Sequence, residues 1–178
     1  MDAVTLRGLQ APLKEQYKAD PGSAVITLRA KGVVDEMSIA CKLETGRAMA
    51  VAGLHPATGG TGIELCSGDM LLEALVACAG VTLKAVSTAI GVKLDHAAVN
   101  AEGDLDFRGT LGVDKTAAVG FSAIRLTFDV KSPAPPEQIA QLLALTERYC
   151  VVYQTLRGSA AITAEITNSA TASASAPG

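Results

Sequence analysis

Cysteine is the residue type with the most potential for chemistry in this chain, and four cysteines are present: Cys41, Cys66, Cys78 and Cys150. No two of them have the spacing of a CxxC motif, and neither His55 nor His96 is grouped with them, so a metal site is poorly supported and we expect none. The start of the chain lacks a basic segment followed by an apolar run, so we expect a cytoplasmic protein without a disulfide scaffold. Each cysteine is then either a redox-active thiol or a small apolar side chain.

Two of the cysteines fall on apolar faces of predicted helices. Residues 68–91 (GDMLLEALVACAGVTLKAVSTAIG) are apolar on nearly every side, with Ser67 as the expected N-cap and Gly91 as the expected stop. Cys78 shares a face of this helix with Leu75, and Cys150 lies on the i, i+3, i+4, i+7 apolar stripe of a second helix. Both sulfurs therefore face the core, and the pattern leaves open whether they meet or only pack.

The other elements surround these helices. We expect an N-terminal helical extension at 1–22, a domain at 23–167 and a disordered, low-complexity tail at 168–178. Within the domain the patterns predict a long hairpin that turns at 31–36, a Gly-rich loop before the first helix, two strands between the helices, and a last strand at 160–167. This order is typical of an α+β fold with a largely antiparallel sheet and two long buried helices.

Composition limits the kinds of partner that the chain is expected to bind. The net charge of -3 offers no basic patch for nucleic acid, and only 3% of the residues are aromatic. Glu73 and Lys84 interrupt the longest apolar run, so we expect no membrane span. A helix that is apolar all round in so small a chain needs more cover than one sheet supplies, which predicts a homodimer.

The two cysteine segments resemble those of a known family. DMLLEALVACAGVTL, which contains Cys78, is similar to the first-cysteine helix of the OsmC/Ohr family (osmotically inducible protein C and organic hydroperoxide resistance proteins), and ERYCVVYQTL, which contains Cys150, is similar to the second. The resemblance covers roughly residues 24–167 and is closer to the OsmC-like branch. It implies antiparallel sheets wrapped around two central helices, in an interlocked dimer whose active sites draw on both subunits.

The resemblance also implies an activity. The expected protein is a cofactor-free, peroxiredoxin-like thiol peroxidase for organic hydroperoxides: Cys78 attacks the peroxide and becomes a sulfenic acid, and Cys150 condenses with it to a disulfide. A dihydrolipoyl protein or a thioredoxin-like thiol would reduce that disulfide. The alternative is a non-catalytic OsmC-like module that binds an apolar small molecule between subunits.

A family site also contains a carboxylate and an arginine. Asp69 matches the carboxylate position, yet nine residues on one helix place it opposite Cys78, so it acts from a bent first turn or across a dimer, or is only a partner of the helix dipole. Glu73 is a displaced carboxylate or the surface partner of Lys84, and we favour the second. The arginine is Arg29 or Arg47, and the resemblance favours Arg29.

Two more residues are candidates for the pocket. His55, in the Gly-rich loop, is a residue of the pocket mouth or an ordinary loop histidine, and Tyr149 is a packing residue or part of the pocket. Val151 stands where the family commonly has a proline directly after its second cysteine.

Overall fold

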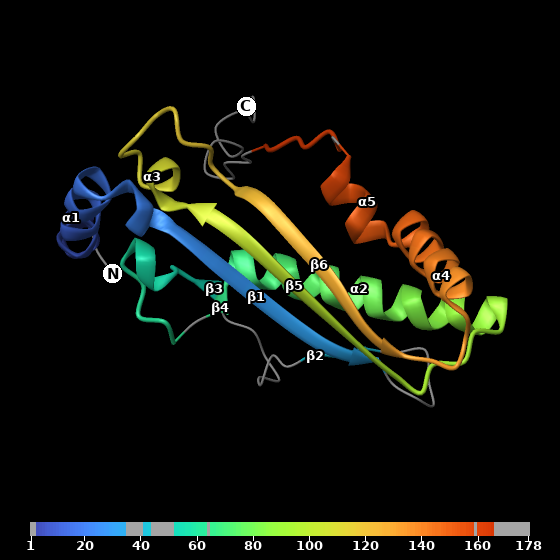
Figure 1. Ribbon diagram of the computed structural model, residues 1–178. Helices are drawn as coiled ribbons and strands as arrows, with labels where there is room; N and C mark the ends of the chain where they lie inside the picture. The colour runs from blue at the N-terminus through green and yellow to red at the C-terminus, as the bar shows by residue number, and fades with distance from the viewer. Residues whose placement is uncertain (1–2, 35–40, 44–51, 64, 159, 166–178) are drawn as a thin grey trace, which may run out of the picture.

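A computed structural model of the chain describes residues 3–34, 41–43, 52–63, 65–158 and 160–165 (Figure 1). The elements, with η for a short 3-10 helix, are α1 (Ala3–Ala19), η1 (Pro21–Ala24), β1 (Val25–Val34), β2 (Cys41–Leu43), β3 (Ala52–Gly53), η2 (Pro56–Thr58), β4 (Leu65–Cys66), α2 (Ser67–Ile90), β5 (His96–Asp106), α3 (Phe107–Thr110), β6 (Phe121–Lys131), α4 (Pro136–Tyr149) and α5 (Val151–Arg157).

An antiparallel sheet with the strand order β2-β1-β5-β6 forms the frame of the fold, and β3 and β4 make a short parallel pair. Helix α2 crosses one face of the sheet over β1 and β5 (Figure 1). Alternation along β5 explains this packing, because Ala97, Val99 and Ala101 are buried toward the core cluster of α2. The antiparallel α+β class predicted from the sequence is confirmed.

The opposite face of the sheet is polar. Arg125 on β6 forms two hydrogen bonds with Asp104 of β5, at 2.6 Å and 2.9 Å, and a longer one with Glu102. Such cross-strand pairs fix the register but contribute little stability, since they are partly exposed. The sheet therefore has one face for solvent and one for the core.

Helix α2 is the central element. It ends at Ile90 and is capped by Gly91, whose φ of +74° is the left-handed conformation that a glycine adopts readily. The Gly91 N–H donates to the carbonyls of Ser87 and Thr88. The predicted N-cap was one residue off, since Cys66 is the cap and its side chain makes no capping hydrogen bond. By length and composition alone α2 could cross a membrane, a test that core helices also pass, and 44% of its most apolar window is buried inside the fold.

The second predicted long helix is interrupted at Cys150. Helix α4 ends at Tyr149, Cys150 is extended (φ −73°, ψ 107°), and α5 begins at Val151. The Cys150 N–H still donates to the Thr146 carbonyl at 2.9 Å, and the Gln154 side chain donates to the Glu147 carbonyl at 2.7 Å. Without these hydrogen bonds, the break in the helix would leave the backbone groups involved without partners. Cys150 therefore lies at a junction, and not in mid-helix as predicted.

Two further predictions were wrong. Residues 31–34, expected as a turn, continue β1 and pair with β5 or β2. Residues 160–165 form no strand, because a strand exists only as part of a ladder and this segment has no described partner strand within the chain. The predicted tail at 168–178 lies outside the described residues.

Candidate functional site

The structure brings Cys78 and Cys150 together. Cys78 is partly buried on α2, Cys150 is only 1% exposed at the α4–α5 junction, and both belong to the same apolar cluster as Leu75 and Leu142. The two side chains are hydrogen-bonded to each other, and both thiols are free. Two residues 72 positions apart in the sequence thus share one site.

The surroundings of Cys78 favour its thiolate. Burial raises the pKa of the Cys78 thiol, but hydrogen bonds from the Val152 N–H and the Cys150 side chain lower it. The Val151 N–H and the Thr82 hydroxyl act in the same direction, and the net result is a pKa below the usual value for cysteine. Hydrogen bonding to the charged form is one of the three ways in which a protein shifts a pKa, and here it outweighs desolvation.

The pKa of the Cys150 thiol is shifted upward, opposite to that of Cys78. Burial raises the pKa of the Cys150 thiol to about 11, the Tyr153 N–H opposes the rise, and the neighbouring Cys78 adds to it. At neutral pH Cys150 is a protonated thiol and a hydrogen-bond donor, while Cys78 is the sulfur closer to ionisation. One thiol is therefore suited to nucleophilic attack and the other to a later step.

Part of this site was missed by sequence reasoning. Thr82 lies four residues after Cys78, hence on the same helix face, and this spacing is a signal that the sequence contains. The Val151 and Val152 amides carry no such signal, because they reach Cys78 only through the break at Cys150. A continuous helix would engage both N–H groups with carbonyls of the preceding turn.

A second group of titratable side chains lies at the N-terminal end of α2. The pKa values of Asp69 and Glu73 are raised by burial, and the charge of Asp69 raises that of Glu73 further. Burial lowers the pKa of His55, and nearby Asp69 opposes this. Nine residues of helix separate Asp69 from Cys78 by ~13.5 Å along the axis. Within one chain, Asp69 therefore interacts electrostatically with His55 and lies far along the helix from the Cys78 sulfur.

Of the other predicted site residues, the structure describes the side chain of Tyr149 and not those of the two arginines. Tyr149 is 57% exposed and lies under the guanidinium of Arg148, 5.5 Å from the ring centre. The backbone of Arg29 pairs with Glu102 of β5, but its side chain is outside the described part of the structure. Arg47 also lies outside the described residues.

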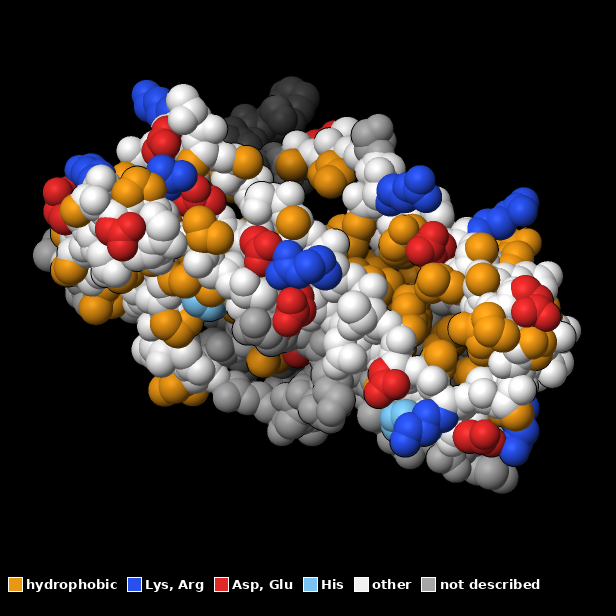
Figure 2. Space-filling model, in the orientation of Figure 1, with side chains coloured by type: hydrophobic (Ala, Val, Ile, Leu, Met, Phe, Trp, Pro, Cys, Tyr) orange, Lys and Arg blue, Asp and Glu red, His pale blue; other side chains and the backbone are white. Residues whose placement is uncertain are grey.

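An apolar groove of about 890 Å³ opens between β6 and the helices α4 and α5. Leu75 and Leu83 of α2 form part of its lining, Ile124, Leu126 and Phe128 line it from β6, and Arg157 is among its few charged residues. Figure 2 shows this hollow as a concentration of hydrophobic side chains between the edge strand and the C-terminal helices. Neither Cys78 nor Cys150 lines it. Across the described residues, no group of three or more His, Cys, Asp or Glu side chains could hold a metal ion.

A family model described as OsmC-like protein matches residues 60–165, which include both cysteines of the site. The chain belongs to the OsmC-like family. Its fold is similar to that of an OsmC-like hydroperoxide resistance protein from Jannaschia sp. CCS1, with a TM-score of 0.58 at 15% identity, over 82% of this chain and 95% of that one.

An OsmC-like protein from Mycoplasma pneumoniae is also similar, with a TM-score of 0.52 at 18% identity, over 76% of this chain and 86% of the other. At these identities the likeness concerns the fold. No curated protein matches the chain. The family resemblance inferred from the two cysteine segments is confirmed.

Proposed function

We propose that this OsmC-like chain is a cysteine-based, peroxiredoxin-like thiol peroxidase that reduces organic hydroperoxides. The observation that carries the proposal is the asymmetric thiol pair: Cys78, with a lowered pKa, is hydrogen-bonded to Cys150, which stays protonated. Membership of the OsmC-like family and the similar fold of a hydroperoxide resistance protein support a role in peroxide chemistry.

The proposed reaction needs no cofactor. The Cys78 thiolate attacks the outer oxygen of ROOH, the O–O bond breaks, and the products are the Cys78 sulfenic acid and, after uptake of one proton, the alcohol ROH. The Cys150 thiol then attacks the sulfenic sulfur, loses its proton and releases water as the disulfide forms. An external dithiol, either a dihydrolipoyl protein or a thioredoxin-like protein in the cytoplasm, reduces the disulfide and is itself oxidised.

The surroundings favour an organic substrate. Leu75 and Leu83 flank Cys78 along α2 and also line the apolar groove. A hydroperoxide with an apolar tail gains free energy when the tail leaves water, at roughly 25 cal/mol per Å² buried, whereas hydrogen peroxide has no such tail.

We propose that the working unit is an interlocked homodimer. Helix α2 exposes Leu71, Val81 and Ile90, and the core-facing side chains of β6 are open to the groove instead of covered by α2. A second copy would bury these side chains and turn α2 and α4 into central helices. The described groups that lower the Cys78 pKa are hydrogen-bond donors without permanent charge. We propose that the second copy adds the charged groups: a cation near Cys78, from Arg29 or Arg47, and a carboxylate, from Asp69 or Glu73.

A titration of free thiols tests the peroxidase. The reduced protein is mixed with cumene hydroperoxide, and we expect the loss of two thiols per chain. Cys78→Ser should lose none, and Cys150→Ser should lose one and form a sulfenic acid that dimedone traps. Cys66→Ser is the matched control and should still lose two. Unchanged thiols in the wild-type protein would exclude the mechanism.

The dimer is tested separately by sedimentation. We expect a dimer of the wild-type chain, and a monomer for Val81→Glu, which places a charge on the exposed face of α2. Val119→Glu is the control, because Val119 is exposed on the loop before β6. A monomeric wild-type protein would contradict this part of the proposal and leave the thiol chemistry untouched.

A second candidate function is a non-catalytic module that binds an apolar small molecule. The observation that favours it is the groove, because a cavity of about 890 Å³ without a cysteine in its lining could hold a ligand that never meets the sulfur. Saturable binding of an apolar fluorescent probe, together with thiols that do not respond to peroxide, would favour this function over the peroxidase.

A further inference from the structure

We propose that the turn built by His55 is a pH-sensitive latch that holds helix α1 against the rest of the fold. The inference is independent of the peroxidase proposal, because it concerns the turn 54–60 and α1 and involves neither cysteine.

Helix α1 is attached through this turn. The Tyr17 hydroxyl donates to the Ala57 carbonyl at 2.6 Å, and the Gln10 side chain donates to the Thr58 carbonyl at 3.2 Å. Gly59 has a φ of +91°, and a Cβ there would lie 3.1 Å from the Cβ of Leu9 on α1. The helix is thus packed directly onto the turn, and both described polar contacts end on carbonyls whose direction the turn decides.

His55 fixes the shape of the turn. Its Nδ1 accepts a hydrogen bond from the Ala57 N–H at 3.0 Å, and its carbonyl accepts from the Thr58 N–H at 2.8 Å and the Gly60 N–H at 3.1 Å. The imidazole ring stacks on Phe107 with the ring centres 5.0 Å apart. Phe107 belongs to the small buried cluster that also contains Tyr17, so the ring, the turn and α1 share one packing unit.

Protonation of His55 is incompatible with this arrangement. A backbone N–H can only donate, so Nδ1 must be unprotonated, and an imidazolium would present an N–H to the N–H of Ala57. Burial already disfavours the charged ring and lowers the pKa of His55. A proton gained at acidic pH therefore removes the side-chain hydrogen bond from His55, one of those that shape the turn and orient the Ala57 and Thr58 carbonyls.

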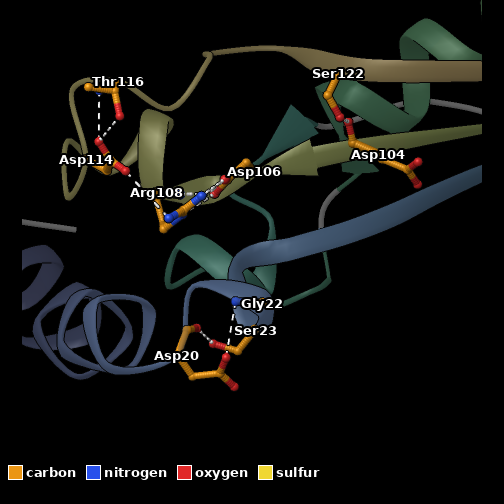
Figure 3. Close-up of polar contacts among 9 residues, drawn as sticks. All are labelled: Asp20, Gly22, Ser23, Asp104, Asp106, Arg108, Asp114, Thr116 and Ser122. Carbon is orange, nitrogen blue, oxygen red and sulfur yellow. Dashed lines mark hydrogen bonds and ion pairs between the residues drawn. The ribbon is translucent and has the colours of Figure 1, made fainter.

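Charged groups near the ring affect the stability of protonated His55. From α2, Asp69 faces His55 and favours its charged form, and Glu73 lies next to Asp69. From α3, Arg108 is engaged by Asp106 at 2.6 Å and Asp114 at 3.5 Å (Figure 3). In the described part of the chain Asp69 is thus the charge that acts on His55, and it favours the protonated ring.

The sign of the pH effect follows. A histidine with a depressed pKa in the closed form stabilises that form above its ordinary value of about 6.5, and the stabilisation is lost as the pH falls toward the depressed value. Between those two values the opening constant of α1 should rise as the pH falls, by at most about tenfold per pH unit. Above that window the latch is closed.

Hydrogen exchange of the α1 amides, followed from about pH 7.5 to about pH 5 and corrected for intrinsic exchange rates, tests the latch. We expect protection of α1 to fall with pH in the wild-type chain. His55→Asn should abolish the pH dependence, because an asparagine oxygen accepts the same N–H but does not titrate in this range. His96→Asn alters the chain's other histidine and should keep the wild-type profile.

Tyr17→Phe provides a second readout. It removes one hydrogen bond to the turn, so α1 should exchange faster at every pH with the same pH slope. A flat profile in the wild-type chain, or an unchanged slope in His55→Asn, would overturn the proposal. Unaltered α1 exchange in Tyr17→Phe would show that the turn does not hold the helix.

Discussion

Helix α2 carries two groups of titratable side chains in contrasting surroundings. At its N-terminal end Asp69 and Glu73 are partly buried, and burial is the largest influence on both, so their pKa values rise. In the middle of the helix burial also acts on Cys78, yet four hydrogen bonds reverse its effect and the pKa falls.

The difference lies in the donors that each group meets. The carboxylates lie near a turn whose polar groups mostly bond to one another, whereas Cys78 faces the start of α5, where backbone N–H groups have no helical partner. Burial by itself favours the neutral form of any acid, and hydrogen-bond donors or a nearby cation are needed to offset it. Within this chain, donors offset it at Cys78. The break at Cys150 is therefore what distinguishes the two regions.

The largest effect should come from loosening the packing that holds the junction. Leu142 is 1% exposed and packs in the same cluster as Cys150, so Leu142→Ala should lower the free energy of unfolding by ~2–5 kcal/mol. Leu143→Ala, at a neighbouring position that is 41% exposed, should lower the free energy of unfolding by much less. Urea denaturation measures both, and equal losses would show that the junction is not held by this core.

Removing the Val151 N–H should reveal how much this one donor lowers the Cys78 pKa. Val151→Pro eliminates the N–H that bonds to Cys78, while proline suits the first position of α5 and the extended Cys150 before it. The pKa of Cys78 should rise, and its alkylation by iodoacetamide at pH 7 should slow by roughly threefold to tenfold. Val151→Ala keeps the amide and should behave as the wild type. A proline variant that reacts at the wild-type rate would mean that this amide does not activate the thiol.

A smaller change is expected at Thr82. Thr82→Val removes the hydroxyl that bonds to Cys78 at nearly constant volume, so alkylation should slow by about twofold to threefold, and Thr82→Ser should restore it. Thr88→Val is the matched control on the same helix, because the Thr88 hydroxyl donates to the Lys84 carbonyl at 2.8 Å. If both valine variants slow the reaction alike, the effect belongs to the helix and not to the sulfur.

The smallest effect is expected at the other end of α2. Since burial raises the pKa of Asp69, the folded state favours its neutral form, and ionisation costs stability as the pH rises through the raised value. Asp69→Asn should therefore gain stability relative to the wild type between acidic and neutral pH, by a fraction of a kcal/mol. Thermal unfolding at several pH values measures this. A relative loss for the variant at neutral pH would mean that attraction to His55 outweighs burial.

Much of the fold could be read from the sequence because its signals are local and periodic. Alternation predicted the strands of the sheet, and apolar density with Gly91 predicted α2 and its end. The turn predicted to begin at residue 31 and the strand predicted to begin at residue 160 were wrong over the described residues 31–34 and 160–165. Whether a strand ends or continues depends on its partner strands as well as on its own residues.

The candidate site was only half predictable. Cys78 and Cys150 follow from helical spacing and from the family resemblance. The association of Asp69 with His55 does not, because His55 reaches α2 from a loop that only the fold positions. Thr82 could have been found from its i+4 spacing, whereas the Val151 and Val152 amides could not.

The sequence by itself determined that two thiols face the interior and that apolar helices and an antiparallel sheet enclose them, because those properties depend on periods of two and 3.6 residues along the chain. The family resemblance already assigned the attack to Cys78, but only the tertiary structure shows how that thiol is activated. Its activation depends on one non-helical residue, Cys150, which frees the first amides of α5 to bond to Cys78, and residue order carries no signal for such a through-space hydrogen bond.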